Sequence, residues 1–387
     1  LQDLSAVAPS FVAGDANGDR SVRLSLRGLA ETNFSAGESV VGIYLDDVPF
    51  TDLNIRDALV FGTQTIKITR GPTGSKLGAA RVGGVIRSKT IEPTDKWRGQ
   101  AELSYGNYKA ASLGAEVAGP IQTNKLFFAF SSLYSQRDGY VRNAFDDTNP
   151  DDRQALGARA KLLYKPTELL DLELIAMGSR YRDGMIPAVP LNTQNPFELS
   201  RDFNGHADTD SVTGALKGNY QREQWRALSV TTARTWQQDI AQDYDFAADP
   251  ITANRVGFSA PDAQEFIQEI RFESNDEDNR LQWVAGGFFS LQSFDGDSGF
   301  TQLPPAPQFT ERTTYTNDKR NYALFGQATY RWAERLDVTG GLRWDLDHRA
   351  LTRTKTQAPF PPPVAPLNAD GSWNSFQPSI ELGWNPS

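Results

Sequence analysis

The chain of 387 residues contains no cysteine and only two histidines. Without cysteine it can form no disulfide scaffold, zinc finger, thiol nucleophile or iron–sulfur cluster. Two histidines leave little for histidine-based metal sites or catalytic dyads. The 48 acidic residues outnumber the 39 basic ones and no basic run is present, so nucleic acid is not expected as a partner.

Long apolar runs are also missing. No stretch reaches the roughly 18 apolar residues of a transmembrane helix. The chain begins at Leu1 without a charged-then-apolar leader, so we expect a mature or partial chain. Abundant instead are 32 glycines and the aromatic residues, which are 22 Phe, 12 Tyr and 8 Trp. This composition is typical of a β-protein, including an outer-membrane barrel, in which each strand exposes every second residue to lipid.

From Arg98 onward, apolar and polar residues alternate with a period of two. Leu162 and Tyr164, for example, alternate with Arg159 and Lys161. Each alternating run covers roughly 8–12 residues, the length with which a tilted strand crosses a bilayer. We count twelve such strands up to Trp384. Alternation by itself fits a half-buried soluble sheet equally well.

The connections between these runs distinguish an outer-membrane barrel from a half-buried soluble sheet. Short turns are predicted near residues 122, 167, 223, 278 and 334, and long polar connections at 137–154, 183–210 and 246–264 and around Pro359. Short turns on one side and long loops on the other are typical of outer-membrane barrels. Aromatic residues near the short turns fit an interfacial girdle, or else ordinary strand aromatics. They are Tyr164, Tyr220, Trp225, Trp283, Tyr330, Trp332 and Trp384.

Residues 1–96 do not continue the hairpin series. Short strand candidates lie between loops rich in Gly and Asp, which predicts a small α/β domain over 1–96 and a barrel over 97–387. Several stretches of this part resemble the plug domain of TonB-dependent outer-membrane receptors. They are SLRG at 25–28, NFS at 33–35, VGIYLDDVP at 41–49, ITRGPTG at 68–74 and GGVI at 83–86. YGNY at 105–108 and RDGYVRN at 137–143 resemble the family's first barrel hairpin and second outer loop.

The resemblance implies a mainly β fold: a transmembrane antiparallel barrel with an N-terminal α/β plug inside its lumen. Family barrels have 22 strands, so about 12 would be present here, and we expect the chain to be a fragment. The implied location is the outer membrane of a Gram-negative bacterium. The implied partners are outer-membrane lipid, a small-molecule or metal-chelate substrate, and TonB with its inner-membrane energising complex. We expect the segment that docks TonB to be absent from this chain.

The implied function is active import of a scarce nutrient complex, most often a ferric siderophore, through plug rearrangement. Cobalamin, an oligosaccharide or an aromatic compound remain alternatives within the family. A passive porin-like or structural outer-membrane protein is the alternative class, although a porin needs no plug. No nucleophile–base pair or convincing carboxylate pair is visible, so we expect neither an enzyme nor a cofactor.

Charged plug residues are predicted to pair with the inner wall of the barrel, in a wet interface that releases at modest cost. The plug candidates are Arg27, Asp46, Asp47, Arg70 and Arg81. Lumen-facing charges of the wall are Glu116, Arg159, Lys161, Glu173, Glu269, Arg271 and Arg343. Alternatively, these charges simply face lumen water.

Candidate substrate contacts combine aromatic and polar side chains, as a small amphipathic ligand requires. In the plug they are Glu31, Asn33, Phe34, Phe50, Asp52 and Asn54, and in the barrel loops Tyr140, Phe203 and Tyr244. The alternative for each of them is an ordinary loop residue that contacts no substrate. An acidic loop with Asp146, Asp147, Asp151 and Asp152 could hold calcium, but a solvated loop explains it better and we expect no metal.

Overall fold

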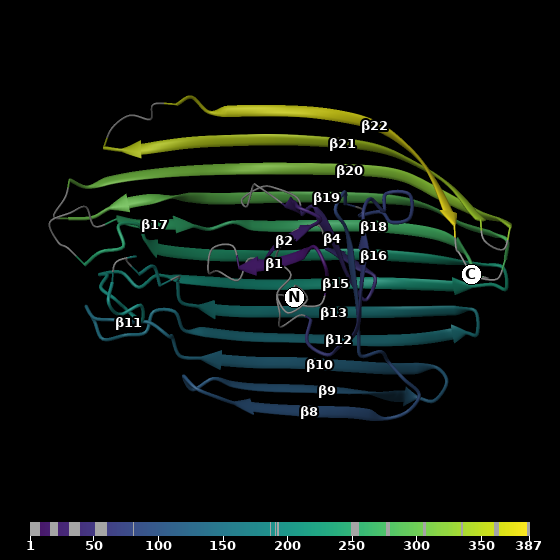
Figure 1. The fold of residues 1–387 in the computed structure, drawn as a ribbon, viewed down its shortest axis with the longest axis horizontal. Helices are drawn as coiled ribbons and strands as arrows, with labels where there is room; N and C mark the ends of the chain where they lie inside the picture. The colour runs from purple at the N-terminus through teal and green to yellow at the C-terminus, as the bar shows by residue number, and fades with distance from the viewer. Residues whose placement is uncertain are drawn as a thin grey trace.

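The computed structural model describes residues 8–15, 22–30, 39–50, 60–79, 81–185, 187–189, 191, 193–248, 255–275, 279–304, 307–333, 336–359 and 364–384. Its main feature is one antiparallel sheet of thirteen strands (Figure 1). Both β17 and β18 pair with β16 and β19, so these two share one position and twelve positions remain. The predicted series of twelve barrel strands is confirmed.

The strands follow one another in chain order across the sheet, from β8 at one edge to β22 at the other. Their bounds are β8 Arg98–Tyr105, β9 Ala111–Gln122, β10 Leu126–Arg137, β12 Arg153–Thr167, β13 Leu170–Asp183, β15 His206–Gln221, β16 Trp225–Asp243, β17 Arg255–Ser259, β18 Asp262–Ser274, β19 Leu281–Gln302, β20 Phe309–Ala333, β21 Leu336–Ala358 and β22 Leu367–Trp384. Two short strands, β11 (Arg142–Asn143) and β14 (Glu198–Leu199), join the connections that follow β10 and β13.

The two faces of the sheet differ in chemistry because successive side chains of a strand point to opposite sides. On β13, Glu173, Ile175 and Met177 are buried, whereas Leu174 between them is 52% exposed. Large apolar side chains continue the exposed face on the other strands, among them Leu162, Leu216, Ile270, Leu324 and Leu342. An apolar outer face and a charged inner face are what a barrel wall in lipid requires.

Several strands are longer than the predicted 8–12 residues, since β19, β20 and β21 contain 22, 25 and 23 residues. The added length lies next to the longer connections. There Thr310, Arg312 and Thr314 carry polar side chains, so the segment shows no apolar period. It is nevertheless a strand because β20 keeps its pairing with β19 and β21. Backbone pairing, and not the lipid, sets the strand ends.

The N-terminal part forms two small sheets that lie in front of the middle of the large sheet in Figure 1. One contains β1 (Phe11–Asp15), β2 (Val22–Leu26) and β3 (Leu29–Ala30). The other has the order β5 (Val48–Phe50), β4 (Val41–Leu45), β7 (Gly84–Thr90) and β6 (Thr63–Arg70). The described residues of this part show the β component of the predicted α/β plug and contain no helix.

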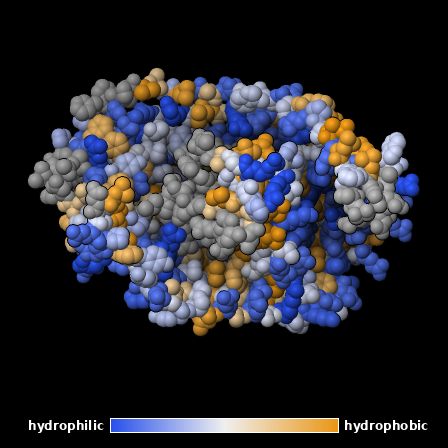
Figure 2. All heavy atoms as spheres, in the orientation of Figure 1, coloured by the Kyte–Doolittle hydropathy of each residue, from blue (hydrophilic) through white to orange (hydrophobic). Residues whose placement is uncertain are grey.

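Two apolar clusters join the N-terminal part to the wall. In one, Phe11, Leu24 and Ile43 pack with Ile175 and Met177 of β13. In the other, the plug contributes Tyr44, Leu77 and Val85, and strands β18 to β20 contribute Ile267, Phe288, Ala323 and Phe325. Seen from the plug side, the molecule still presents mostly hydrophilic surface (Figure 2). Among the described residues, no helix has the length and apolarity needed to cross a membrane.

Leu174→Arg tests which face meets lipid. An arginine at mid-membrane on the outer face of a barrel costs about 2–4 kcal/mol. We therefore expect the variant to lose that much unfolding free energy, measured by denaturant titration in phospholipid vesicles. Leu191→Arg is the matched control, because Leu191 lies fully exposed in a connection. Equal stability of the two variants would contradict a lipid-facing Leu174.

Candidate functional site

The N-terminal part touches the wall through a tight hairpin turn. Leu45 and Val48 pair across the turn between β4 and β5, with Asp46 and Asp47 as its two central residues. Both aspartates have left-handed backbones, with φ of 55° and 69°. Positive φ at both central positions defines a type I′ turn, which matches the twist of a hairpin, and aspartate tolerates this conformation better than most residues. The turn places two carboxylates at one hairpin tip.

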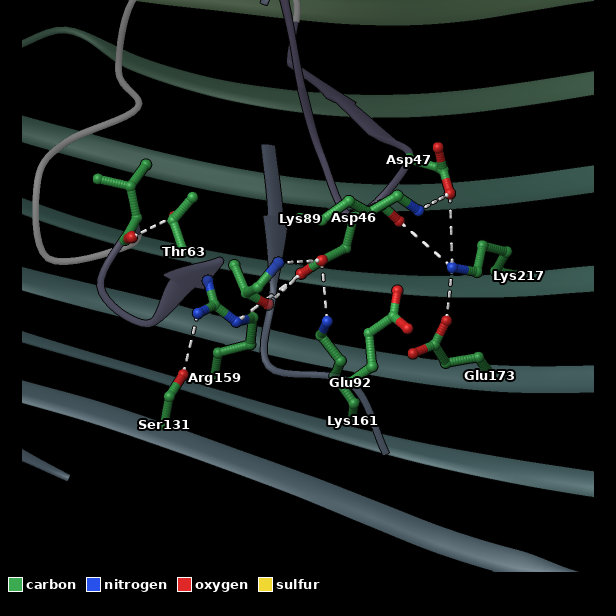
Figure 3. Close-up of polar contacts among 12 residues, drawn as sticks. Asp46, Asp47, Thr63, Lys89, Glu92, Ser131, Arg159, Lys161, Glu173 and Lys217 are labelled. Carbon is green, nitrogen blue, oxygen red and sulfur yellow. Dashed lines mark hydrogen bonds and ion pairs between the residues drawn. The ribbon is translucent and has the colours of Figure 1, made fainter. Parts of the chain in front are cut away.

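Asp46 is an acceptor for both the plug and the wall (Figure 3). Thr90 of β7 donates its backbone N–H to Oδ1 (2.9 Å) and its hydroxyl to Oδ2 (2.7 Å). From β12, Lys161 Nζ lies 2.9 Å from Oδ1 and Arg159 Nε lies 3.9 Å from Oδ2. The side chains of Asp46 and Lys161 are each only 2% exposed. This is a buried ion pair, with hydrogen bonds that offset part of the cost of dehydration.

Asp47 extends the network toward β13 and β15. It binds Arg87 and Lys89 of β7 at 2.7 and 2.6 Å. Lys217 Nζ lies 3.6 Å from the Asp47 carboxylate and 2.6 Å from Glu173 Oε2. Lys217 therefore bridges an acid of the plug and an acid of the wall (Figure 3). We name Asp46, Asp47, Arg159, Lys161, Glu173 and Lys217 the central ion-pair network.

The network holds both aspartates ionised. Burial alone would raise the pKa of Asp46, but Lys161 and then Arg159 outweigh it and lower that pKa below its usual value. Burial is likewise outweighed at Asp47, where Lys89 and Lys217 lower the pKa of the carboxyl. The predicted wet interface is therefore wrong at this point: the pairs are buried, so their separation costs more than that of exposed pairs.

A second contact holds the turn after the Arg-Gly-Pro segment. Arg343 of β21 donates to the carbonyl oxygens of Gly74 (3.1 Å), Leu77 (3.0 Å) and Gly78 (3.0 Å). Asp345 fixes the same guanidinium through two hydrogen bonds of 2.7 Å. Because a guanidinium presents its donors in a rigid fork, one side chain can hold three carbonyls of the plug. Close packing adds to it, since a Cβ at Gly78 would clash with Phe288.

Tyr44 makes a third contact. Its hydroxyl donates to Glu269 Oε2 (3.2 Å) and accepts the N–H of Ala79 (3.0 Å). Gly78 N–H donates to the other oxygen of Glu269, and Arg271 lies 3.2 Å from that carboxylate. Burial and the charge of Glu269 raise the pKa of Tyr44. The hydroxyl therefore stays protonated and can donate.

Next to these contacts lies a cavity of about 310 Å³ between plug residues 72–82 and strands β18 to β22. Its lining combines charges of both signs with aromatic rings, including Arg81, Glu265, Phe288, Lys319, Arg343 and Trp373. Arg343 faces the cavity and holds the plug at the same time. A ligand in this cavity would therefore meet the side chain that fixes the 73–78 turn.

The predicted plug contacts divide into two groups. Asp46 and Asp47 meet wall lysines, and Arg81 lines the cavity. Arg27 and Arg70 are exposed, and among the described residues neither forms an ion pair with the wall, contrary to expectation. The reason is their placement: Arg27 has a left-handed φ of 57° in the β2–β3 turn, and Arg70 ends β6, an edge strand.

The predicted substrate contacts are scattered. Glu31, Asn33, Phe34, Asp52 and Asn54 lie outside the described residues. Phe50 does not face a ligand, because it is 2% exposed and Arg234 of β16 lies over its ring at 4.8 Å. Tyr140 (44% exposed) packs edge-on against Tyr108, and Tyr244 (46%) packs near Phe300. Phe203 is half-buried. No ring contact joins Tyr140, Phe203 and Tyr244 to one another.

Sequence reasoning missed Lys217, Tyr44 and Asp345 as plug–wall residues. Lys217 carries a signal, because it occupies the polar phase of the alternation with Leu216 and Tyr220. Asp345 lies two residues after Arg343 and shares its face of β21. Tyr44 carries none, since a tyrosine in an apolar strand reads as core.

A long antiparallel sheet with an apolar outer face, wrapped around an ion-paired N-terminal domain, is the architecture of a plugged outer-membrane β-barrel. The family model described as "TonB dependent receptor-like, beta-barrel" matches residues 97–387. The chain belongs to the TonB-dependent receptor family, whose members are outer-membrane proteins of Gram-negative bacteria.

Individual curated proteins that are similar to the chain are consistent with this family. The chain is 25% identical over 336 residues to the pesticin receptor of Yersinia enterocolitica, covering 84% of this chain and 47% of that protein. It is 34% identical over 84 residues to the vitamin B12 transporter BtuB of Vibrio vulnificus, covering 21% of this chain and 13% of that protein. The chain thus spans about half the length, 47%, of the pesticin receptors to which it is similar.

Solved structures share the fold. The ferric yersiniabactin uptake receptor FyuA from Yersinia pestis superposes with a TM-score of 0.84 at 19% identity, covering 98% of this chain and 58% of FyuA. The unliganded ferric citrate transporter FecA gives 0.70 at 14% identity, covering 100% of this chain and 58% of FecA.

Lys161→Met tests the central ion-pair network. It leaves the Asp46 carboxylate buried without its nearest cation, which costs about 3–5 kcal/mol. We expect that loss of unfolding free energy at pH 7, and a smaller loss in the double variant Asp46→Asn/Lys161→Met. Because the folded pKa of Asp46 is lowered, the pair stabilises fully above the unfolded pKa of about 3.9 and is lost as the pH falls through the folded value.

The difference between wild type and Lys161→Met should therefore shrink in acid. Denaturant titrations at a series of pH values measure it. Lys125→Met, in the β9–β10 turn, is the control for removal of an exposed lysine. A Lys161→Met penalty that is absent at pH 7, or unchanged in acid, would contradict the assigned ion pair.

Proposed function

We propose that the protein is an outer-membrane transport receptor that binds a ferric siderophore and admits it to the periplasm when the plug rearranges. It would act as a transporter and not as an enzyme. The observation that carries this proposal is the attachment of the plug to the wall. Buried ion pairs and the Arg343 clamp hold it in place, and both are reversible contacts.

Separating these contacts requires work. Removing one partner of a buried pair costs several kcal/mol, and the two apolar clusters between plug and wall add to that. The outer membrane has no ATP supply. Family membership therefore supports TonB and its inner-membrane complex as the source of work, through a pull on the N-terminal segment. An order-to-disorder change of the plug would open the path.

The similar structures support an iron chelate as substrate, because one is a receptor for ferric yersiniabactin and the other a transporter of ferric citrate. The cavity beside Arg343 supports binding of an aromatic chelate with polar groups, since charged side chains of both signs and aromatic rings line it. Ligand contact with Arg343 there would weaken its hold on the 73–78 turn, which couples binding to release.

Uptake of radiolabelled iron tests the substrate. We expect the receptor to restore uptake of at least one ferric siderophore in a Gram-negative host that lacks its own siderophore receptors, and only when TonB is present. Labelled cobalamin and an oligosaccharide are run in parallel. Uptake of either one without any ferric siderophore would move the proposal to that substrate, and TonB-independent leakage would indicate a passive pore.

A reversible cross-link tests plug movement. A Cβ built on Gly341 of β21 lies 2.9 Å from Cβ of Ser75, so a small outward shift brings a Ser75→Cys/Gly341→Cys pair to the roughly 3.5–4.5 Å of a disulfide. No native cysteine competes. We expect the oxidised variant to bind substrate normally but to lose uptake, and reductant to restore it. Each single variant is a control. Full uptake in the oxidised state would show that the 73–78 turn does not need to leave the wall.

A further inference from the structure

Three carboxylates converge at the ends of β15 and β16 that adjoin the long connections. Asp202 lies in the connection before β15, Asp243 is the last residue of β16, and Asp245 follows it. One carboxylate oxygen of each lies within 4.8 Å of the others. Three like charges at this separation repel one another. In the register of β15 and β16, the cluster adjoins the paired residues His206 and Ala241, eleven positions along β15 from Lys217 of the central ion-pair network.

Asp243 carries an oxygen that the described protein groups leave without a hydrogen bond. Its side chain is 1% exposed, and Oδ1 accepts the backbone N–H groups of Asp245 and Phe246 at 3.0 Å each. Oδ2 is buried and takes no hydrogen bond among the described residues. A buried carboxylate oxygen without a partner is costly, so this atom calls for a ligand.

The local charge balance favours a divalent cation. The charge of Asp243 acts on Arg201, which also donates Nη2 to the carbonyl of Asn204 at 2.7 Å. Asp245 accepts backbone N–H groups at both oxygens, from Ala247 at 3.2 Å and from Arg255 at 2.8 Å, and these neutral donors add no positive charge. A divalent cation between the three carboxylates would relieve their mutual repulsion. The donor atoms are all carboxylate oxygens, with no histidine or cysteine in the cluster. Hard oxygen donors select calcium or magnesium over transition metals.

We propose that Asp202, Asp243 and Asp245 form a calcium site that ties the connection before β15 to the connection after β16. Calcium accepts irregular coordination by carboxylates, carbonyls and water, whereas magnesium demands near-ideal octahedral geometry and keeps its water. Three carboxylates from two separate connections suit the more flexible ion.

The site differs from the acidic loop singled out in the sequence. There, Asp151 accepts the backbone N–H groups of Tyr140 and Val141, and Asp147 pairs with Arg142. Asp146 accepts hydrogen bonds from Thr148 and Asn204. None of the four carboxylates of that loop has a buried oxygen without a hydrogen bond, which distinguishes the loop from Asp243.

Calcium at this site would organise three connections together. Asn143 of the 138–152 connection binds the carbonyl of Arg201 (2.8 Å), next to Asp202, and accepts the N–H of Arg201 (3.1 Å). The 138–152 connection is thus already fastened to the one that carries Asp202. Tyr140, Phe203 and Tyr244 lie one on each of the three connections. The inference rests on this geometry and not on the proposed siderophore function.

Terbium luminescence tests the site in the detergent-solubilised receptor. Tyr244 lies between Asp243 and Asp245 in the chain, so excitation of tyrosine should sensitise bound Tb³⁺. We expect calcium to displace terbium with a Kd in the range of about 0.1–1 mM typical of extracellular sites, and magnesium to displace it far less well. Asp243→Asn should weaken calcium binding by at least about tenfold.

Asp239→Asn is the matched control, because Asp239 lies on the same strand but its side chain is 70% exposed. It should bind calcium as the wild type does. Thermal unfolding in EDTA checks folding: Asp243→Asn should unfold at or above the wild-type temperature, because it removes repulsion. Added calcium should raise that temperature for the wild type and not for Asp243→Asn.

The proposal is overturned if no calcium-dependent signal appears up to about 10 mM, well above the expected Kd. It is equally overturned if Asp243→Asn binds as tightly as the wild type, or if Asp146→Asn abolishes binding instead. The last result would assign the ion to the 138–152 connection. Each outcome can be read whether or not the receptor transports a siderophore.

Discussion

The position of the plug depends on the burial of one carboxylate. Asp46 and Lys161 are each 2% exposed, and Lys161 is the nearest cation to the buried carboxylate. The hydrogen bonds from Thr90 fix the carboxylate from the plug side, and the pairing of β12 with its neighbours fixes the lysine from the wall side. The left-handed turn that places Asp46 at a hairpin tip is needed for the two to meet.

Much of the wall could be predicted because lipid imposes a strict rule on every second residue. The alternation assigned Lys161, Arg159 and Arg343 to the inner face, and each is buried there. The strand ends could not be predicted in the same way. Where β20 leaves the lipid, both faces become polar and only backbone hydrogen bonds, which the sequence does not display, keep it extended. The extra length of β19 to β21 follows from that.

Which residues pair with each other in the site was harder to predict than which residues belong to it. Asp46 and Asp47 stand out in the sequence, but their pairing with Lys161 and Lys217 depends on how the hairpin docks across three wall strands. Phe50 is predicted to contact a ligand because it is an aromatic residue beside the polar Asp52 and Asn54, whereas β5, to which it belongs, is buried throughout. Asp202 and Asp243 are some forty positions apart, and only strand pairing brings them together.

The placement of Asp46 and Asp47 on one turn has a mechanical consequence. The two ion pairs reach different wall strands, β12 and β15, yet they share one rigid support of two residues. A displacement of the hairpin tip therefore loads both pairs at once instead of one after the other. Bonds loaded together resist small forces jointly and then fail within a narrow range of force. The attachment is therefore expected to withstand thermal fluctuations and to break only above a threshold force.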